Sequence, residues 1–523
     1  MKRFLLFAIL TFALLGVAGI LYLTRSGPGV SGDAVHYMDG ARNLIAGHGY
    51  ARSAGDGTFK PITGFPPSFS VLMAVVTLFS GNTLEAGRWL NALLFGCNVF
   101  LMAWLAYRLT QSWGVSLLAG LFAFAFRDAL LMHAWVMSEG LYIALTLAAF
   151  ACLLRYWERQ RTNWLVLAAL AAGFSVLARY VGLALVGAIG LGLLLFGDRA
   201  AKPVLRGVFS HWQSRISAAF WFGLIGLLPL AAWLGRNSLV AGNLTARQTA
   251  YHPVSREMLV AFFDELSSWF VPNDLHFAWK PRLAVFGLFV LVGAALFLWL
   301  AWRSRLSVDG SALRAFHLQS VMATFMAAYL AIVFVNMLTL DASTSEGGLR
   351  RYLLPIYYVL ALWMLTVFHQ ALRARPVRLI AGAVAVGLLG VHLFGAVHFM
   401  RAPGYVFGYT DARNASPELV AALQAIQPQR PLITNDYEAV YFLAGRPPYG
   451  LPQTYDNFTR QENEDRSSYE ADLLEIEQLL KDGAVLVAYN AESNPAVDAL
   501  TPKLVRWQTF GTVVFYVHPG FAP

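Results

Sequence analysis

The chain has 523 residues, of which 57% are hydrophobic and only 13% are charged. This composition excludes an ordinary soluble globular protein and indicates a protein that crosses a membrane several times. The formal net charge of +9 does not indicate nucleic-acid binding, because the basic residues form small groups between apolar segments. Cys97 and Cys152 both lie in apolar segments, which predicts small buried residues rather than a disulfide or a thiolate metal site.

The N-terminus predicts an uncleaved signal anchor. Lys2 and Arg3 precede an apolar segment from Phe4 to Leu23, which is close to the ~20 residues needed to span a hydrocarbon core. This segment is longer than the apolar region of a signal peptide, and no small-residue cleavage site follows it. We therefore expect a cytoplasmic N-terminus, with the residues from 24 onward outside.

Length and hydropathy predict about eleven membrane spans in total. An inside N-terminus places the basic residues of each short loop in the cytoplasm, among them Arg108, Arg155 and Arg303. The apolar segment 65–79 is too short for a typical span and contains Pro66, and counting it as a span would place those arginines outside. We predict a re-entrant or interfacial helix there. The later spans are expected near 84–107, 113–132, 139–156, 164–178, 181–196, 216–235, 282–302, 316–340, 352–370 and 379–400.

The predicted fold is thus a polytopic α-helical membrane module of residues 1–401, with long external loops at 24–83 and 236–281. Beyond residue 402 the chain alternates between helical and strand patterns. Ser416 and Pro417 predict a helix start, "PLITND" and "AVLVAYN" predict buried strands, and "SSYEADLLEIEQLLKDG" predicts an amphipathic helix closed by Gly483. We expect residues 402–523 to form a small external α/β domain.

Polar residues gather in the first external loop. Asp33 lies at the start of a segment with helical periodicity, whose apolar face indicates a helix along the outer membrane surface. Asp33 could be its N-cap, or could face a pocket, and the two roles are compatible. His36 and His48 have no metal-ligand spacing and are expected at a surface or an interface. The apolar face of this helix would consist of Tyr37, Ala41, Leu44 and Ile45.

Ionisable residues are also predicted at the outer ends of later spans, where they are costly and indicate function. Glu139 begins the fourth span, although an acid there could simply complement the helix dipole. Arg179 lies between two short apolar segments on the presumed outer side, where an anionic partner is expected. The same argument applies to several other basic residues, which could instead extend toward the lipid headgroups: Arg236, Lys280, Arg282, Arg350 and Arg351.

A carboxylate on the external face, surrounded by basic residues at headgroup depth, suggests a reaction between a lipid phosphate and a hydroxyl. The sequence also resembles a known family. The segments "GDAVHYMDGARNLIAGHGY", "GFPPSFSVLMAVVTLFSGNTLEAGRWLNALLFG", "SEGLYIALTLAAFACLLRYW", "LARYVGLAL" and "RRYLLPIYYVLALW" occur in an order similar to that of the GT-C superfamily. More narrowly, they resemble bacterial relatives of protein O-mannosyltransferases and of aminoarabinose lipid A transferases.

Such enzymes use sugars linked to polyprenyl phosphate on the non-cytoplasmic side of the membrane. The resemblance implies that Asp33 is the catalytic acid of the first loop and Glu139 that of the second, and that Arg351 and Tyr352 are the late basic-aromatic pair. The sequence departs from this pattern at two positions. Ala34 stands where many relatives have a second acid. Phe65 stands where relatives have a lysine near the lipid phosphate, and the nearest lysine is Lys60.

The sequence therefore predicts a glycosyltransferase of the inner (plasma) membrane that acts with inversion. A hydroxyl of a lipid, glycan or protein acceptor, deprotonated by Asp33, would attack the sugar of a polyprenyl-phosphate donor. The sequence leaves metal dependence open: two acids near a phosphate could recruit a divalent cation, but no cluster of ligand residues demands one. The donor phosphate would be bound by residues among Arg179, Arg351, Arg350, Lys60, Arg236 and Lys280. Other substrate contacts are expected from His36, Tyr37 and Tyr352.

Two other functions remain open from sequence. A transporter or flippase of lipid-linked glycans would need polar residues along a path through the bilayer, whereas the centres of these spans carry almost no charge. A membrane-anchored ligand-binding protein would not need so many spans or the charges at their outer ends. Substituting Asp33 and Glu139 separates these alternatives, because an anchor should tolerate both changes.

Overall fold

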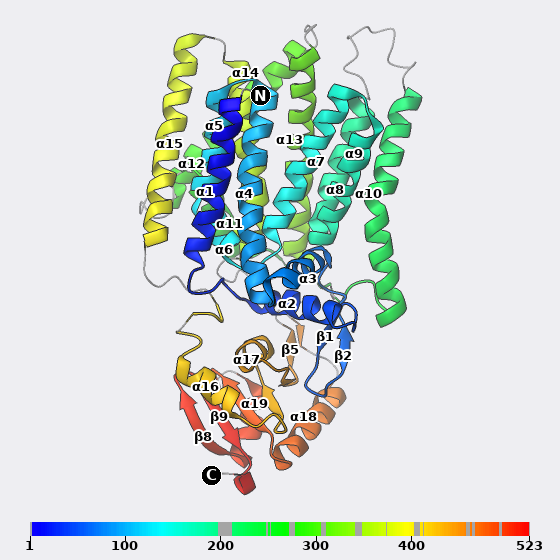
Figure 1. Cartoon of the computed structure of the whole chain (residues 1–523), viewed down its shortest axis with the longest axis vertical. Coiled ribbons are helices and arrows are strands. Elements are labelled where there is room, and N and C mark those ends of the chain that lie inside the picture. Colours follow the sequence, from blue (N-terminus) through cyan, green and yellow to red (C-terminus); the bar gives the residue numbers. More distant parts are fainter. Residues whose placement is uncertain are drawn as a thin grey trace.

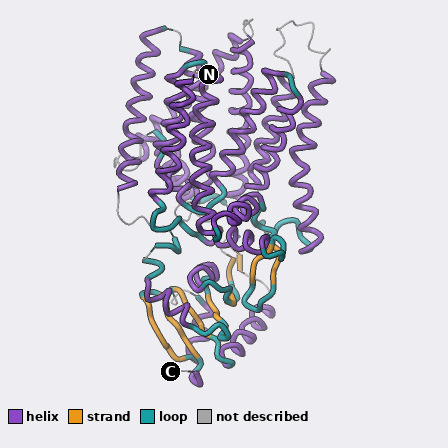
Figure 2. The backbone as a smooth tube through the Cα atoms, viewed as in Figure 1, coloured by secondary structure: helices purple, strands orange, loops and turns teal. Residues whose placement is uncertain are grey.

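The computed structural model describes residues 3–196, 212–246, 249–251, 253–270, 278–304, 310–339, 348–372, 374–401, 408–411, 413–456, 461–462, 466–490 and 494–521. Figure 1 shows a bundle of long helices with a smaller, sheet-containing part beneath it. The strands all lie at or below the lower end of the bundle, as the orange segments of Figure 2 show. The C-terminus lies at the far end of this lower part, and the N-terminus lies at the opposite end of the bundle.

Each segment in which a span was predicted contains a helix. By length and composition, eight of the described helices could cross a membrane, or nine if the pair α5–α6, bent by 55°, is one span. Helices α8 and α9 are shorter, so the number eleven stays a prediction. The helices of the bundle are α1 (Arg3–Leu23), α4 (Thr83–Thr110), α5 (Trp113–Ala125), α6 (Arg127–Ala134), α7 (Glu139–Arg159), α8 (Thr162–Ala178), α9 (Leu183–Phe196), α10 (Trp212–Ala241), α12 (Trp279–Ser304), α13 (Gly310–Thr339), α14 (Gly348–Ala371) and α15 (Arg375–Arg401).

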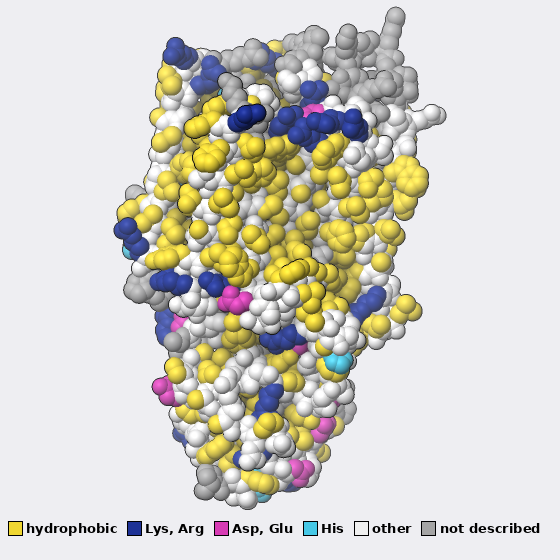
Figure 3. Space-filling model, viewed as in Figure 1, with side chains coloured by type: hydrophobic (Ala, Val, Ile, Leu, Met, Phe, Trp, Pro, Cys, Tyr) yellow, Lys and Arg dark blue, Asp and Glu magenta, His cyan; other side chains and the backbone are white. Residues whose placement is uncertain are grey.

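The surface of the bundle has the pattern of a membrane protein. Figure 3 shows a broad apolar band between two levels at which lysines and arginines gather. Cys97 belongs to this outer surface, so the prediction that it is buried was wrong. The reason is that an apolar side chain on a membrane helix is stable facing lipid as well as facing the core. Cys152 is partly buried, and both thiols are free.

The first external loop is folded against the lower end of the bundle. It contains α2 (Gly32–Ile45), the antiparallel pair β1 (Ala51–Ser53) and β2 (Phe59–Pro61), and α3 (Ser68–Ser80). Ser31 caps α2, because its side chain accepts a hydrogen bond from the backbone nitrogen of Ala34. The N-cap reading of Asp33 was therefore wrong, since Asp33 lies in the first turn, where its charge still complements the helix dipole.

The C-terminal residues form a five-stranded sheet in the order β4-β3-β7-β9-β8. Strand β3 is parallel to β4 and β7, whereas β9 is antiparallel to β7 and β8. The division of the chain at residue 401 stays a prediction. The elements are α16 (Pro417–Ala425), β3 (Leu432–Thr434), α17 (Tyr437–Ala444), β4 (Tyr449–Gly450), β5 (Tyr455–Asp456), β6 (Gln461–Glu462), α18 (Arg466–Lys481), β7 (Val485–Tyr489), α19 (Pro495–Leu500), β8 (Val505–Phe510) and β9 (Val513–Val517).

Several local predictions in this part are confirmed. Ser416 caps α16 by accepting a hydrogen bond from the backbone nitrogen of Leu419, and Pro417 occupies the first turn. The segments "PLITND" and "AVLVAYN" contain β3 and β7. Gly483 follows α18 with a φ of +101°, a conformation that a residue with a side chain rarely adopts.

Candidate active site

Four charged side chains meet at the lower end of the bundle. The Arg351 guanidinium donates from Nη2 to Asp33 Oδ2 at 2.7 Å and from Nε to Glu139 Oε1 at 2.8 Å. Arg179 Nη1 donates to the same Glu139 oxygen at 2.5 Å. Two carboxylates and two guanidiniums therefore form one connected group, which we call the Asp33–Arg351 cluster. Its formal charges balance.

The cluster is built from the ends of four helices. Asp33 lies in the first turn of α2 and Glu139 is the first residue of α7, so both carboxylates lie at helix N-termini, which favour negative charge. Arg351 lies near the start of α14, and Arg179 directly follows α8. The chain thus brings segments far apart in sequence to one point where the bundle meets the first external loop.

The two acids differ sharply in exposure. The Glu139 side chain is 0% exposed, whereas the Asp33 side chain is 33% exposed. Asp33 Oδ2 is held by Arg351, and the described part of the chain offers no partner to Oδ1. Asp33 is therefore the carboxylate that a substrate hydroxyl could reach. Glu139 is enclosed, and it orients the two arginines.

Tyr37 connects α2 to the start of α7. Its hydroxyl lies 3.1 Å from Ser138 Oγ, directly before Glu139. Burial, together with the charges of Asp33 and Glu139, raises the pKa of Tyr37 to about 12, so the phenol stays protonated. The side chain is buried, which indicates that Tyr37 fixes Asp33 relative to Glu139.

Arg179 has the anionic partner that its position predicted, but that partner is Glu139 of the same chain. Its guanidinium also lies over the Tyr352 ring, at 5.4 Å from the centroid. The arginine enters the cluster because α8 ends at Ala178 and the chain turns through the short helix η1 (Tyr180–Gly182) before α9. This turn sets the direction of the Arg179 side chain.

The turn needs a glycine at position 182, because close packing leaves no room for a side chain there. A Cβ at this position would lie 2.6 Å from the backbone nitrogen of Val176 and 2.7 Å from the backbone carbon of Ser175, and backbone atoms cannot move aside. We expect Gly182→Ala to lower stability by about 1–3 kcal/mol and to displace Arg179. Thermal unfolding in detergent measures the effect. Gly187→Ala on α9 is the control, because a Cβ there meets nothing within 4 Å. Equal unfolding temperatures for the two variants would contradict the expectation.

Helix α17 of the C-terminal part contacts α2. His36 Nε2 lies 3.1 Å from Glu438 Oε1, and the imidazole stacks on Phe65 with ring centroids 4.9 Å apart. Burial raises the pKa of Glu438 and the His36 hydrogen bond lowers it, with a net downward shift. His36 is thus engaged with the C-terminal part, three residues from Asp33 on the same helix.

Asp39 is a buried acid that sequence reasoning missed. Its side chain accepts hydrogen bonds from the Tyr441 hydroxyl at 2.5 Å and from the Ser53 backbone nitrogen at 2.7 Å. Tyr437 also donates to the Ser53 carbonyl oxygen at 2.5 Å. These bonds join α2, β1 and α17. An acid in the middle of an amphipathic helix was the available signal, since such a residue is rarely buried without partners.

Three of the proposed phosphate ligands do not join the cluster. Arg236 donates to the carbonyl oxygens of Ile62 and Tyr50, both at 2.7 Å, and so anchors the first external loop to α10. Lys60 is exposed on β2. Lys280 lies 6.0 Å from the ring centroid of its neighbour Trp279. Within the described ranges, no hydrogen bond or ion pair connects these three residues to Asp33 or Glu139.

Arg350 belongs to a second charged group. Its Nε lies 3.2 Å from Asp128 Oδ1 and 3.5 Å from Glu265 Oε2. Arg350 therefore faces away from Asp33 and Glu139, the partners of Arg351. Glu265 lies in α11 (Arg256–Ser268), within the second external loop. Adjacent residues on a helix point in directions about 100° apart, which is why two consecutive arginines serve separate acid pairs.

The raised pKa of Glu265 should make the stability of the folded protein depend on pH. Burial and the neighbouring Asp128 charge raise the pKa of Glu265 to about 8 from its usual 4.5. The unfolded chain therefore ionises first, so the contribution of this group is complete below about pH 4.5 and is lost as the pH rises to about 8. We expect the unfolding temperature to fall over this range, and to fall less in Glu265→Gln. Parallel curves for the two proteins would show that folding does not raise the pKa of Glu265.

No preformed site for a divalent cation is found in the part of the chain that the structure describes. The described residues contain no group of three or more His, Cys, Asp or Glu side chains placed to hold a metal ion. In the cluster, moreover, both carboxylates already bind guanidiniums.

The comparisons with known proteins agree with this architecture. Residues 37–238 match the family model described as dolichyl-phosphate-mannose-protein mannosyltransferase. No individual curated protein matches the sequence. The apo structure of ArnT from Cupriavidus metallidurans is similar with a TM-score of 0.62 at 15% identity, over 98% of each chain.

Two further solved structures share the fold. ArnT from Cupriavidus metallidurans bound to undecaprenyl phosphate is similar with a TM-score of 0.54 at 13% identity, over 98% of each chain. The Archaeoglobus fulgidus oligosaccharyltransferase in the apo form is similar with a TM-score of 0.53 at 11% identity, over 94% of this chain and 70% of that one. The chain is thus a multi-pass membrane protein that shares the fold of these solved structures, and its residues 37–238 match the dolichyl-phosphate-mannose-protein mannosyltransferase family model, as the resemblance to the GT-C superfamily led us to expect.

Proposed function

We propose that this protein transfers a sugar from a polyprenyl-phosphate-linked donor to a hydroxyl acceptor on the non-cytoplasmic side of the membrane. The observation that carries the proposal is the Asp33–Arg351 cluster, in which a partly exposed carboxylate is oriented by a guanidinium. The match to a mannosyltransferase family model supports the reaction class, and undecaprenyl phosphate bound to a protein of the same fold supports the donor class.

The positions of these groups support the following steps. Asp33 accepts the proton of the acceptor hydroxyl as its oxygen attacks the anomeric carbon of the sugar. The bond from that carbon to the phosphate oxygen breaks, and polyprenyl phosphate leaves with the bonding electron pair. The guanidiniums of Arg351 and Arg179 stabilise the charge that grows on the departing phosphate. Displacement in a single step inverts the anomeric configuration.

An assay with purified protein tests the proposal. Polyprenyl-phosphate-linked sugars are supplied with detergent-solubilised membrane glycolipids as acceptors, and the release of polyprenyl phosphate is measured. Lipid-linked sugars that accumulate in cells lacking the protein identify the donor to use. A transporter or flippase would move such lipids without releasing polyprenyl phosphate, and a ligand-binding protein would leave them unchanged.

The proposal also requires that the cluster face the outside. In a variant without Cys97 and Cys152, we expect a cysteine at Leu474, which is 67% exposed, to react with an impermeant maleimide from outside. A cysteine at the exposed Arg159 should react only from the cytoplasmic side. Glu158 is unsuitable for labelling, because it pairs with Arg108 at 2.5 Å. The reverse labelling pattern would mean that the whole bundle is inverted in the membrane and that the cluster faces the cytoplasm.

A further inference from the structure

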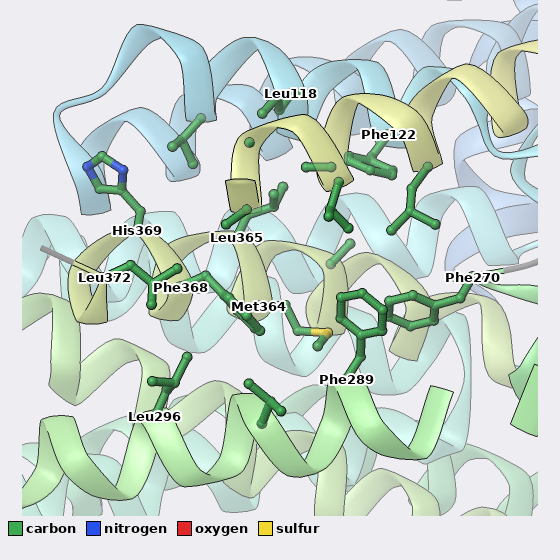
Figure 4. A pocket seen from close by; sticks show the side chains of 18 of the residues that line it. Leu118, Phe122, Phe270, Phe289, Leu296, Met364, Leu365, Phe368, His369 and Leu372 are labelled. Carbon is green, nitrogen blue, oxygen red and sulfur yellow. The ribbon is translucent and has the colours of Figure 1, made fainter. Parts of the chain in front are cut away.

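Two adjoining cavities lie in the bundle, and together they extend from the level of Trp269 and Tyr357 to the end opposite the Asp33–Arg351 cluster. The first, about 480 Å³ in volume, lies between α5, α12, α14 and α15 and is lined almost entirely by apolar side chains such as Leu118, Phe289, Leu296 and Met364. Figure 4 shows it as an elongated groove, with Phe270 and Phe289 at one end and His369 and Leu372 at the other. We call it the apolar groove.

The second cavity, about 510 Å³ in volume, is polar and basic. It lies where α4, α12, α13, α14 and α15 end or begin, and Arg108, Arg303 and Arg378 line it. The described residues that line it include no carboxylate. His369, Leu372 and Arg378 line both cavities, so the apolar groove and this arginine pocket adjoin at these three side chains.

We propose that the two cavities together bind an acidic glycerophospholipid of the membrane, with an acyl chain in the apolar groove and its phosphate in the arginine pocket. The apolar groove is elongated and lined by apolar side chains (Figure 4), which suits an acyl chain, and the arginine pocket supplies the positive charge that matches an anionic headgroup. Arg108 already pairs with Glu158, so Arg303 and Arg378 are the main candidates for the phosphate. Arg303 is oriented by Trp299, at 5.1 Å from the ring centroid.

This lipid is distinct from the donor of the proposed reaction. Arg351 lies near the start of α14, whereas His369, at the junction of the two cavities, lies near its end. At 1.5 Å per residue, about 27 Å of helix separates these levels. A sugar donor must place its phosphate at the Asp33–Arg351 cluster, so the arginine pocket is available to another anionic lipid. The inference does not depend on the proposed activity.

Native mass spectrometry of the full chain in detergent tests the headgroup requirement. The protein is titrated with phosphatidylglycerol, with phosphatidylcholine of the same acyl chains, and with undecaprenyl phosphate. We expect phosphatidylglycerol to bind more tightly than phosphatidylcholine, and the double variant Arg303→Ala, Arg378→Ala to weaken it by on the order of 30-fold. Arg375→Ala is the control for the Arg378→Ala half of this variant, because it removes one arginine charge from α15 outside both cavities.

A second pair of variants tests the acyl-chain requirement. Gly382 lines the apolar groove, and a Cβ there meets nothing within 4 Å, so Gly382→Phe should fill the groove without disturbing α15. Gly387 also lies on α15 in open space but does not line the groove, so Gly387→Phe is the control. We expect phosphatidylglycerol binding to be lost in Gly382→Phe and retained in Gly387→Phe.

Two results would overturn the inference. Equal binding of phosphatidylglycerol and phosphatidylcholine, unchanged in the arginine variants, would show that no headgroup is recognised. Displacement of phosphatidylglycerol by undecaprenyl phosphate, with binding of both lost in Gly382→Phe, would assign the apolar groove to the carrier lipid instead. Unfolding temperatures of all variants, measured alongside, show whether a loss of binding reflects the site or the fold.

Discussion

Replacing Asp33 with asparagine should lower the rate of sugar transfer by about 10²–10⁴-fold, the contribution expected of a general base. The carboxamide has nearly the shape of the carboxylate, and Ser31 rather than Asp33 caps α2, so the helix should still form. An amide cannot accept the proton of the acceptor hydroxyl. We therefore expect a loss in kcat with little change in donor binding or unfolding temperature.

The control is Asp56→Asn. Asp56 is a fully exposed carboxylate of the same external loop, with its hydrogen bonds confined to Thr58, so its substitution removes the same charge away from the cluster. Release of polyprenyl phosphate is measured for both variants at saturating donor and acceptor. Near-normal turnover in Asp33→Asn would assign the proton transfer to another group and leave Asp33 as a partner of Arg351.

The individual elements were readily predicted because their signals are local. A membrane span is a run of apolar residues of fixed length, and helix caps such as Ser416 need only their near neighbours. For the same reason, Asp33 and Glu139 could be identified as candidates one at a time, each as an acid where apolar surroundings make acids costly. The structure places both acids in one cluster, while their catalytic roles stay a prediction.

Pairings between distant segments could not be predicted in this way. Arg350 and Arg351 look equivalent in sequence, yet one faces Asp128 and Glu265 and the other faces Asp33 and Glu139. Which acid each arginine meets depends on the rotation of α14 against its neighbours, and that rotation is set by packing over the whole bundle.

The contact of α17 with α2 was missed for a similar reason. The C-terminal part was expected beside the membrane module, but its pattern of strands and helices says nothing of which surface it meets. Tyr441 and Glu438 reach Asp39 and His36 because residues 408–410 run alongside residues 28–30, with the Tyr409 backbone nitrogen donating to the Val30 carbonyl oxygen at 2.9 Å. Hydrogen bonds between such distant segments leave no periodic pattern in the sequence, so they could not be predicted from it.

Arg351 should be the most sensitive basic residue of the site, because among the described residues it alone binds both acids. Arg351→Ala removes the partner of Asp33 and leaves the enclosed Glu139 with Arg179 alone, so we expect kcat/KM for the donor to fall by about 10²-fold or more. Lysine keeps the charge but cannot reproduce the two donations of a planar guanidinium. Arg351→Lys should therefore also lose donor use, by a smaller factor.

Arg350→Lys is the matched comparison, since it makes the same change one residue earlier on α14, against the other acid pair. Rates are measured with donor and acceptor varied separately, and unfolding temperatures are measured for each variant. A loss confined to the donor dependence of Arg351→Lys supports a phosphate held by Arg351. If Arg350→Lys loses donor use while Arg351→Lys does not, the phosphate binds beside Asp128 and Glu265. Arg351 would then serve only to hold Asp33 and Glu139 in place.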